Sequence, residues 1–140
     1  MAFDQLDDVS YFVDENLLGF HKLLMRSGRT DSIAPGDDRC PSIPLGTPDL
    51  DWMPIVSRSD LIVISRDRRI GSRPAELDVF RGFGIRSVWL GGKRDLRPDS
   101  QLSLFLRYEA RLLQFAAELG AGPWMLNITA SGVRSMPIRP

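Results

Sequence analysis

The segment Leu61–Ser65 constrains the fold more than any other, because it is a continuous apolar run that leads directly into charged residues. A strand without polar alternation is typical of the centre of a parallel sheet that is covered on both faces. Parallel neighbours need long crossover connections, which are usually helices. This run therefore predicts an α/β domain with helices on both sides of its sheet.

The rest of the chain alternates short apolar runs with helical patterns, as βαβ units do. Further strands are expected at Tyr11–Val13, Ile85–Leu90 and Trp124–Thr129, with a weak one at Asp31–Ala34 and a hairpin partner at Val133–Ile138. Helices are expected after a cap at Asn16, near Asp49, after Ser72 and after Pro98. The prediction is one domain over residues 1–140, a three-layer α/β/α sandwich with a mostly parallel five-stranded sheet.

The net charge and the cysteine content exclude several classes of protein. The 18 Lys and Arg residues are balanced by 18 Asp and Glu residues, which excludes a basic field over the whole chain, as passive nucleic-acid binders have. The one cysteine, Cys40, excludes a disulfide framework and a cysteine-ligated zinc site, and it suits a reducing compartment. No signal peptide or membrane span is expected, so a cytoplasmic protein is predicted.

Three aspartates are expected at the edge of the sheet where ligands bind. Asp14 follows the first strand, Asp67 follows the run Leu61–Ser65, and Asp49 stands at a helix start. Open parallel sheets bind ligands beyond the carboxyl ends of their strands, where the strand order reverses. Carboxylates that meet there repel one another unless a cation neutralises them, and Mg²⁺ or Mn²⁺ suits oxygen ligands. Such a site can activate water for displacement at phosphorus.

A group of arginines beside Asp67 would supply the local positive field that the net charge lacks, since guanidinium groups suit phosphate oxygens. Its members are Arg66, Arg68, Arg69 and Arg73. Each feature also has an ordinary alternative: aspartates that follow strands act as turn residues, Asp49 suits a helix cap, and arginines line solvated loops. The convergence of the three acids is thus a prediction from topology.

The sequence gives less support to a catalytic triad, a thiol nucleophile or a phosphate-binding loop. His21 is the only histidine and lies on a helix face between leucines, which leaves no Ser–His–Asp triad. Cys40 lies in a proline-rich loop without an obvious base, so a thiol nucleophile is rejected. The segment Gly91-Gly92-Lys93 lacks the spacing of a phosphate-binding loop.

Four segments, taken in order, resemble the PIN-like domain of VapC-type toxins. They are Tyr11–Leu17, Asp49–Pro54, Ile62–Ile70 and Arg73–Glu76, and the similarity continues into the tail at Gly122–Trp124. The resemblance implies an α/β/α fold with a parallel sheet and metal-dependent endoribonuclease activity. It also implies a small antitoxin protein as partner.

The resemblance assigns roles to particular residues. The family's first three metal-binding acids correspond to Asp14, Asp49 and Asp67. Asn16 matches the polar residue two positions after the first acid, and Asp51 and Glu76 are additional acids that have surface or capping alternatives. A fourth acid, which many PIN nucleases carry, is not clear in this chain. A three-acid site, a weaker enzyme and a relative that has lost cleavage all stay open.

The first hypothesis is therefore a ribonuclease that depends on Mg²⁺ or Mn²⁺ and acts as the toxin of a toxin–antitoxin pair. The aspartates would hold the ion and the arginines would steer the RNA substrate; a homodimer stays open. The alternative is a PIN-like module, weak or inactive as an enzyme, that binds RNA or protein. A receiver-like phosphoacceptor is disfavoured, because no lysine follows the strand Trp124–Thr129.

Overall fold

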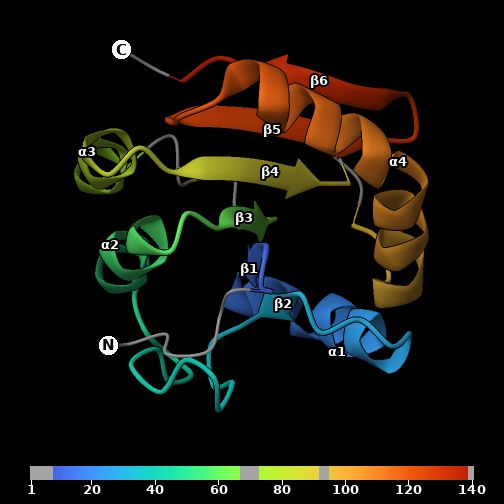
Figure 1. The fold of residues 1–140 in the computed structure, drawn as a ribbon, viewed down its shortest axis with the longest axis horizontal. Helices are drawn as coiled ribbons and strands as arrows, with labels where there is room; N and C mark the ends of the chain where they lie inside the picture. Colours follow the sequence, from blue (N-terminus) through green and yellow to red (C-terminus); the bar gives the residue numbers. More distant parts are fainter. Residues whose placement is uncertain (1–7, 67–72, 92–94, 139–140) are drawn as a thin grey trace.

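The computed structural model of the chain describes residues 8–66, 73–91 and 95–138 (Figure 1). Its sheet has the strand order β2-β1-β3-β4-β5-β6. The strands are β1 (Tyr11–Val13), β2 (Ser32–Ile33), β3 (Ile62–Ser65), β4 (Arg86–Leu90), β5 (Trp124–Thr129) and β6 (Gly132–Met136). The pairs from β2 to β5 are parallel, and β6 joins β5 as an antiparallel hairpin.

In the described part of the chain, helices alternate with these strands. They are a short 3-10 helix, η1 (Glu15–Leu17), and the α-helices α1 (Leu18–Arg26), α2 (Asp49–Arg58), α3 (Pro74–Gly82) and α4 (Pro98–Leu119). Figure 1 shows α2 and α3 on one face of the sheet and α1 and α4 on the other. The predicted three-layer α/β/α sandwich is confirmed.

The predicted number of five strands is wrong, because the sheet has six. The weak segment at Asp31–Ala34 contributes β2, a strand of only two residues at one edge. The hairpin partner of β5 contributes β6 at the other edge, where two of its five residues are exposed. β2 is buried but too short to carry a hydrophobic pattern of its own, and β6 is partly exposed and is fixed by its hairpin with β5.

The side chains of β1 alternate between two cores, one on each face of the sheet. The rings of Tyr11 and Phe105 of α4 meet edge to face, with centroids 5.3 Å apart. On the other face, Phe12 lies against Trp52 of α2 with ring centroids 4.7 Å apart. Because aromatic pairs add about 0.5–1.5 kcal/mol to the energy of burial, β1 is fixed from both sides. Asp14 directly follows this strand, so its backbone is held in a fixed position.

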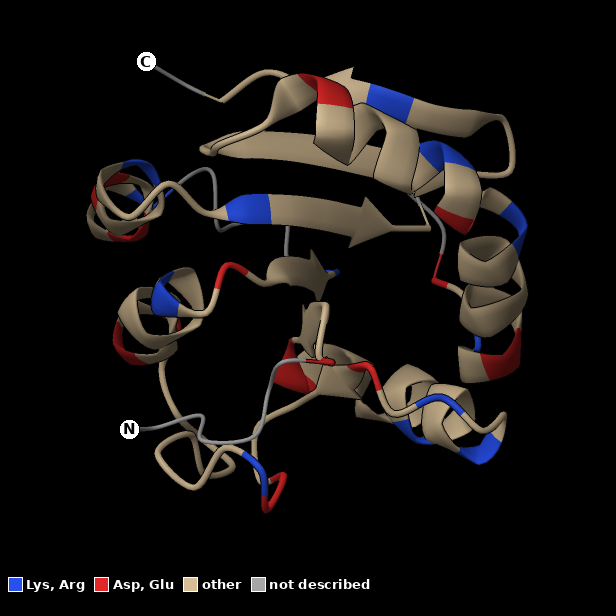
Figure 2. Ribbon diagram, in the orientation of Figure 1, with Lys and Arg blue, Asp and Glu red and all other residues tan. Residues whose placement is uncertain are grey.

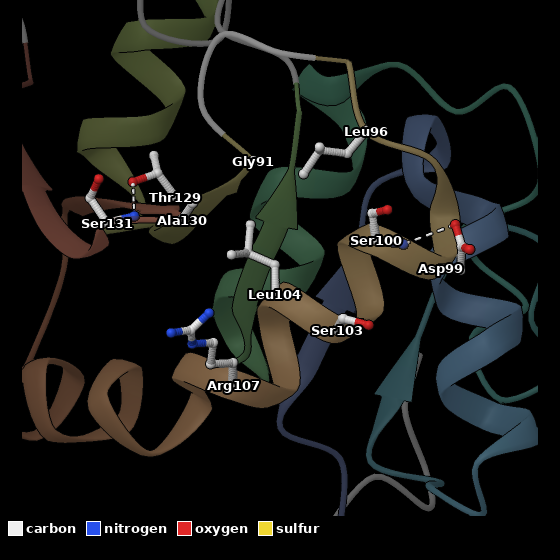
Figure 3. Close-up of a pocket in the computed structure, with 10 residues that line it drawn as sticks. All are labelled: Gly91, Leu96, Asp99, Ser100, Ser103, Leu104, Arg107, Thr129, Ala130 and Ser131. Carbon is white, nitrogen blue, oxygen red and sulfur yellow. Dashed lines mark hydrogen bonds between the residues drawn. The ribbon is translucent and has the colours of Figure 1, made fainter.

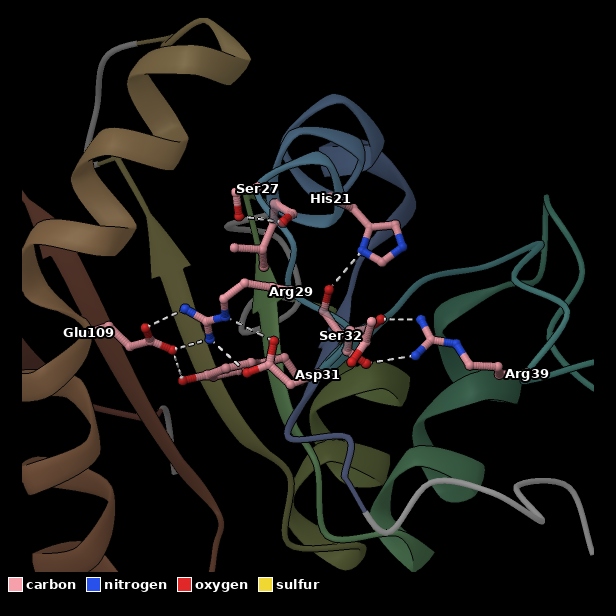
Figure 4. A network of polar contacts seen from close by, with 10 residues as sticks. His21, Ser27, Arg29, Asp31, Ser32, Arg39 and Glu109 are labelled. Atoms are coloured by element: carbon pink, nitrogen blue, oxygen red, sulfur yellow. Dashed lines mark hydrogen bonds and ion pairs between the residues drawn. The ribbon is translucent and has the colours of Figure 1, made fainter.

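One cluster of charged side chains fastens α4 to the segment before β2 (Figure 4). Arg29 donates to both oxygens of Glu109, at 2.7 and 2.6 Å, and to both oxygens of Asp31, at 3.0 and 2.6 Å. The hydroxyl of Tyr11 donates to Glu109 at 2.7 Å. Burial, together with the Glu109 hydrogen bond, raises the pKa of Tyr11, and hydrogen bonds to Glu109 and Asp31 raise the pKa of Arg29. The phenol therefore stays neutral and the guanidinium stays charged at neutral pH.

A second cluster fastens α1 to β2 and to the turn that follows it (Figure 4). His21 is buried, with Nδ1 3.0 Å from the Ser32 hydroxyl and Nε2 3.8 Å from the Asp37 carboxylate. Arg39 in turn donates to Asp37 at 2.8 Å. Burial lowers the pKa of His21 below its ordinary value of 6.5, and Arg39 adds to this, although Asp37 acts in the opposite direction.

We expect the protein to lose stability as the pH falls below about 6.5, the ordinary pKa of histidine. The imidazole in the unfolded chain binds a proton more readily than the buried imidazole of His21, so protonation favours unfolding and the free energy of unfolding rises with pH across this window. Urea unfolding at a series of values from about pH 5 to pH 8 measures the effect. The variant His21→Gln should flatten the profile, since the chain has no other histidine. An equal slope in the variant would assign the acid sensitivity to carboxylates instead.

Candidate active site

The strand order reverses between β1 and β3, because β2 lies on the outer side of β1 and all later strands lie beyond β3. The carboxyl ends of β1 and β3 therefore flank a switch point, which is the ligand-binding position in open α/β sheets. Val13 pairs with Ile64 in the register of these strands. The next residues along the two strands, Asp14 and Ser65, thus stand side by side at this edge.

Among the described acids at this edge, Asp14 is the most buried, with 6% of its surface exposed. Its Oδ2 accepts a hydrogen bond of 2.9 Å from the hydroxyl of Ser65, and its main-chain N–H donates to the carbonyl of Ile64 at 2.9 Å. A buried carboxylate is costly without compensation by hydrogen bonds or a cation. Ser65 is not among the site residues predicted from the sequence, where its only signal is that a polar residue ends an otherwise apolar strand.

Asn16 does not cap a helix, contrary to the sequence-based prediction. It lies within η1, and the cap position of α1 is Leu17 without a side-chain cap hydrogen bond. Its Oδ1 instead accepts a long hydrogen bond of 3.4 Å from the main-chain N–H of Arg66. The tertiary pairing of β1 with β3 decides this contact, since it brings the turn after Asp14 next to the end of β3.

The side chain of Arg66 fastens the end of β3 to the end of β4. Its Nη1 donates to the carbonyl of Leu90 at 2.8 Å, and its guanidinium lies 5.5 Å from the ring centroid of Trp89. The indole N–H of Trp89 donates back to the carbonyl of Arg66 at 3.0 Å. Arg66 therefore has a structural role at this edge, and its contact with RNA stays a prediction.

Asp49 is the first residue of α2, and its carboxylate is held by the core. Its Oδ1 accepts a hydrogen bond of 3.0 Å from the indole N–H of Trp52, which is 1% exposed and packs on β1. The predicted alternative of a helix cap is wrong, because Pro48 occupies the cap position and no side-chain cap hydrogen bond forms. Trp52 is thus both a core residue and the donor that orients Asp49, a second role that its apolar pattern does not reveal.

The start of α2 lies toward the same edge as Asp14. The helix ends at Arg58, shortly before β3 begins at Ile62, so its first turn is at the opposite end, toward the carboxyl edge. In addition, Glu15 accepts a hydrogen bond of 2.6 Å from the main-chain N–H of Gly46. This contact joins the residue after Asp14 to the loop that leads into α2.

Glu76 stands in the first turn of α3 and is 8% exposed. Its Oε1 accepts a hydrogen bond of 2.7 Å from Arg73, whose own side chain is 46% exposed. Its Oε2 is buried and has no hydrogen-bond partner among the described residues. A buried carboxylate oxygen without a partner is rare in folded proteins, and it is a position that a cation or water satisfies. Asp51, by contrast, is exposed on α2.

The remaining predicted residues, Asp67, Arg68 and Arg69, lie outside the described residues. Within residues 8–66, 73–91 and 95–138, no three Asp, Glu, His or Cys side chains form a group that could hold a metal ion. The meeting of Asp67 with the other acids therefore stays a prediction. The carboxylate oxygens of Asp14, Asp49 and Glu76 are of the hard type that Mg²⁺ and Mn²⁺ prefer, and the unpartnered Oε2 of Glu76 fits such an ion.

The state of Cys40 also limits the chemistry. Cys40 is fully buried, its thiol donates to the carbonyl of Ala34 at 3.3 Å, and burial raises its pKa to about 11, so it is a poor nucleophile.

Charges of both signs are interspersed over the described elements (Figure 2). Among the described helices, none has the length and apolar character needed to cross a membrane.

Comparison with known families gives one match. The family model described as a PIN-like domain matches residues 9–92, which run from just before β1 to just after β4. The matched segment contains the switch point and the first turns of α2 and α3. Neither the curated proteins nor the solved structures give a match.

Proposed function

Because the chain belongs to the PIN-like domain family, we propose that it is a metal-dependent endoribonuclease that hydrolyses RNA phosphodiester bonds. The family supports a nuclease-type fold. The observation that carries the proposal is the buried carboxylate of Asp14, which sits at the switch point and accepts the hydroxyl of Ser65. Carboxylate oxygens at the switch point are hard ligands of the kind that Mg²⁺ and Mn²⁺ prefer, so this position suits a site that takes a cation.

The metal-holding residues in this proposal are Asp14, Asp49 and Asp67, with Glu76 as a further acid. When bound, Mg²⁺ or Mn²⁺ would supply Lewis-acid stabilisation and a water of lowered pKa. The chain itself contributes the orientation of the oxygens: Ser65 fixes Oδ2 of Asp14, and Trp52 fixes Oδ1 of Asp49. Outer hydrogen bonds of this kind typically contribute about 10–100-fold to metal affinity or activity.

The first turns of two helices support the same arrangement. Asp49 opens α2 and Glu76 lies in the first turn of α3, on the same face of the sheet. The positive end of a helix dipole stabilises a carboxylate by roughly 0.3–1 kcal/mol. Both acids therefore stand where the backbone of a helix interacts favourably with a negative charge. Arg68, Arg69 and Arg73 are the candidates for contacts to the RNA phosphates, since net charge supplies no general attraction.

We further propose that the enzyme is the toxin of a toxin–antitoxin pair, with an antitoxin protein as its partner. It rests on the resemblance of the acid-bearing segments to those of VapC-type toxins. An antitoxin that blocks the switch-point edge would inhibit cleavage, so co-expression of such a protein should relieve any growth defect that the chain causes.

The direct test is cleavage of a fluorescent single-stranded RNA. We expect cutting with Mn²⁺ or Mg²⁺, none with EDTA, and recovery when excess Mn²⁺ is added back, because the acids require the ion to act. Cutting that persists undiminished in EDTA would contradict the metal mechanism.

A second candidate function is a module that binds RNA without cutting it. It keeps the PIN-like fold and rests on the sequence, in which a fourth acid is not clear. A gel-shift assay on the same RNA separates the two. Binding in EDTA that is never followed by cutting in Mn²⁺ would support the module.

A further inference from the structure

A pocket of about 550 Å³ lies at the carboxyl ends of β4 and β5 (Figure 3). It is formed by the residue after β4, the first turns of α4 and the turn between β5 and β6. Its lining includes Gly91, Leu96, Ser100, Ser103, Arg107 and Ser131. Pockets that hold small ligands measure about 300–1,000 Å³, so this one has room for a nucleotide.

Arg66 connects the pocket to the switch point. Its main chain bonds to Asn16 on one side, and its guanidinium reaches the carbonyl of Leu90 on the other. Gly91 follows directly and lines the pocket, with φ at +103°. A Cβ at Gly91 would come within 2.9 Å of Nη1 of Arg66 and 2.9 Å of Leu96, so glycine is required for this close approach. The Arg66 side chain thus links the end of β3, next to Asp14, to the residue that lines the pocket at the end of β4.

The pocket wall is held in shape by two hydrogen bonds of the turn between β5 and β6. The hydroxyl of Tyr108 on α4 donates to the carbonyl of Ala130 at 2.9 Å, which ties the turn between β5 and β6 to the helix. The main-chain N–H of Ser131 also bonds to the hydroxyl of Thr129 at 3.2 Å. A preformed pocket costs less ordering on binding than a flexible one.

The lining chemistry suits a ligand with hydroxyls, polar edges and a phosphate. Ser100 and Ser103 of α4 and Ser131 of the turn bring hydroxyl groups, which both donate and accept hydrogen bonds. Arg107 brings a guanidinium, the group best suited to phosphate oxygens. Among the described lining residues the acid is Asp99, which accepts the N–H of Ser100 at 3.0 Å and lies 3.5 Å from Arg97, which offsets its charge.

We propose that this pocket binds one ribonucleotide of a single-stranded RNA, next to the phosphate that is cleaved at the switch point. This inference rests on the proposed function for its substrate. Single-stranded RNA is the source, because only an unstacked nucleotide can enter a pocket and present its base edges and 2′-hydroxyl. The pocket would thereby select where along the strand the enzyme cuts.

The test measures binding separately from cutting. A fluorescent single-stranded RNA is titrated with the full chain in EDTA and followed by anisotropy. Ser103→Leu fills the cavity from an exposed helix position, and Arg107→Gln removes its guanidinium. We expect each variant to raise the Kd about tenfold, a loss of about 1.4 kcal/mol. Arg111→Gln, one turn further along α4 and outside the lining, is the matched control and should change the Kd less than twofold.

The outcomes separate this proposal from the nuclease itself. If the wild type cuts RNA but both pocket variants bind it as well as the control does, the pocket proposal is overturned and the nuclease stands. If no metal supports cutting but the pocket variants still weaken RNA binding, the nuclease falls and the pocket stands. A wild type that does not bind RNA, or that binds DNA of the same sequence equally well, would overturn ribonucleotide recognition. Unchanged thermal unfolding of the variants shows that their folds are intact.

Discussion

Replacement of Asp14 by Asn should abolish metal-dependent RNA cleavage and leave the fold intact. The amide has the shape of the carboxylate and can still accept the hydroxyl of Ser65, so the end of β1 keeps its local bond. It loses the negative charge that the ion requires. Loss of one electrostatic contact in an active site commonly lowers kcat by about 10²–10³-fold, and a metal ligand should reach at least that range. Initial rates on a labelled RNA in Mn²⁺ measure the loss.

The matched control is Asp60→Asn, the same substitution at an exposed position just before β3, at the opposite edge of the sheet. Its cleavage rate should equal that of the wild type. Thermal unfolding of all three proteins checks the fold, and calorimetric titration with Mn²⁺ checks the ion. A rate in purified Asp14→Asn equal to that of the control would remove Asp14 from the mechanism.

Replacement of Glu109 by Ala should lower the free energy of unfolding by about 2–4 kcal/mol. Its carboxylate, 17% exposed, accepts hydrogen bonds from Arg29 and from Tyr11. Without Glu109, the buried hydroxyl of Tyr11 loses its hydrogen-bond acceptor. The partly buried guanidinium of Arg29 keeps only its ion pair with Asp31. Breaking such a pair costs about 3–5 kcal/mol at fully buried sites, and partial exposure lowers the figure here. Urea unfolding at neutral pH is the measurement.

Glu118→Ala provides the control, because Glu118 lies on the same helix but is exposed near its end. It should change stability by no more than about 0.5 kcal/mol. Glu109→Gln keeps an acceptor for Tyr11 and should fall between the two. Equal stability of Glu109→Ala and Glu118→Ala would show that the cluster contributes nothing to the fold.

The sequence by itself determined the layers of the fold and the positions of the acids along the chain. The apolar run at β3 predicts a sheet covered on both faces, and the structure has helices on both. The helices α3 and α4 begin at Pro74 and Pro98, as expected from a residue whose fixed φ and missing N–H suit the first turn. These features are local, since they depend on periodicity and on the chemistry of neighbouring residues.

Only the tertiary structure decided which side chains meet. Ser65 lies 51 residues from Asp14, and Arg29 lies 80 residues from Glu109, yet both pairs are hydrogen-bonded. The sheet register and the packing of helices on it set these contacts, and neither is encoded in a short window of sequence. For the same reason Asn16 bonds to the end of β3 rather than capping a helix. The local sequence pattern thus predicts where the carboxylates stand along the chain. The pairing of distant strands determines which side chains hydrogen-bond to them.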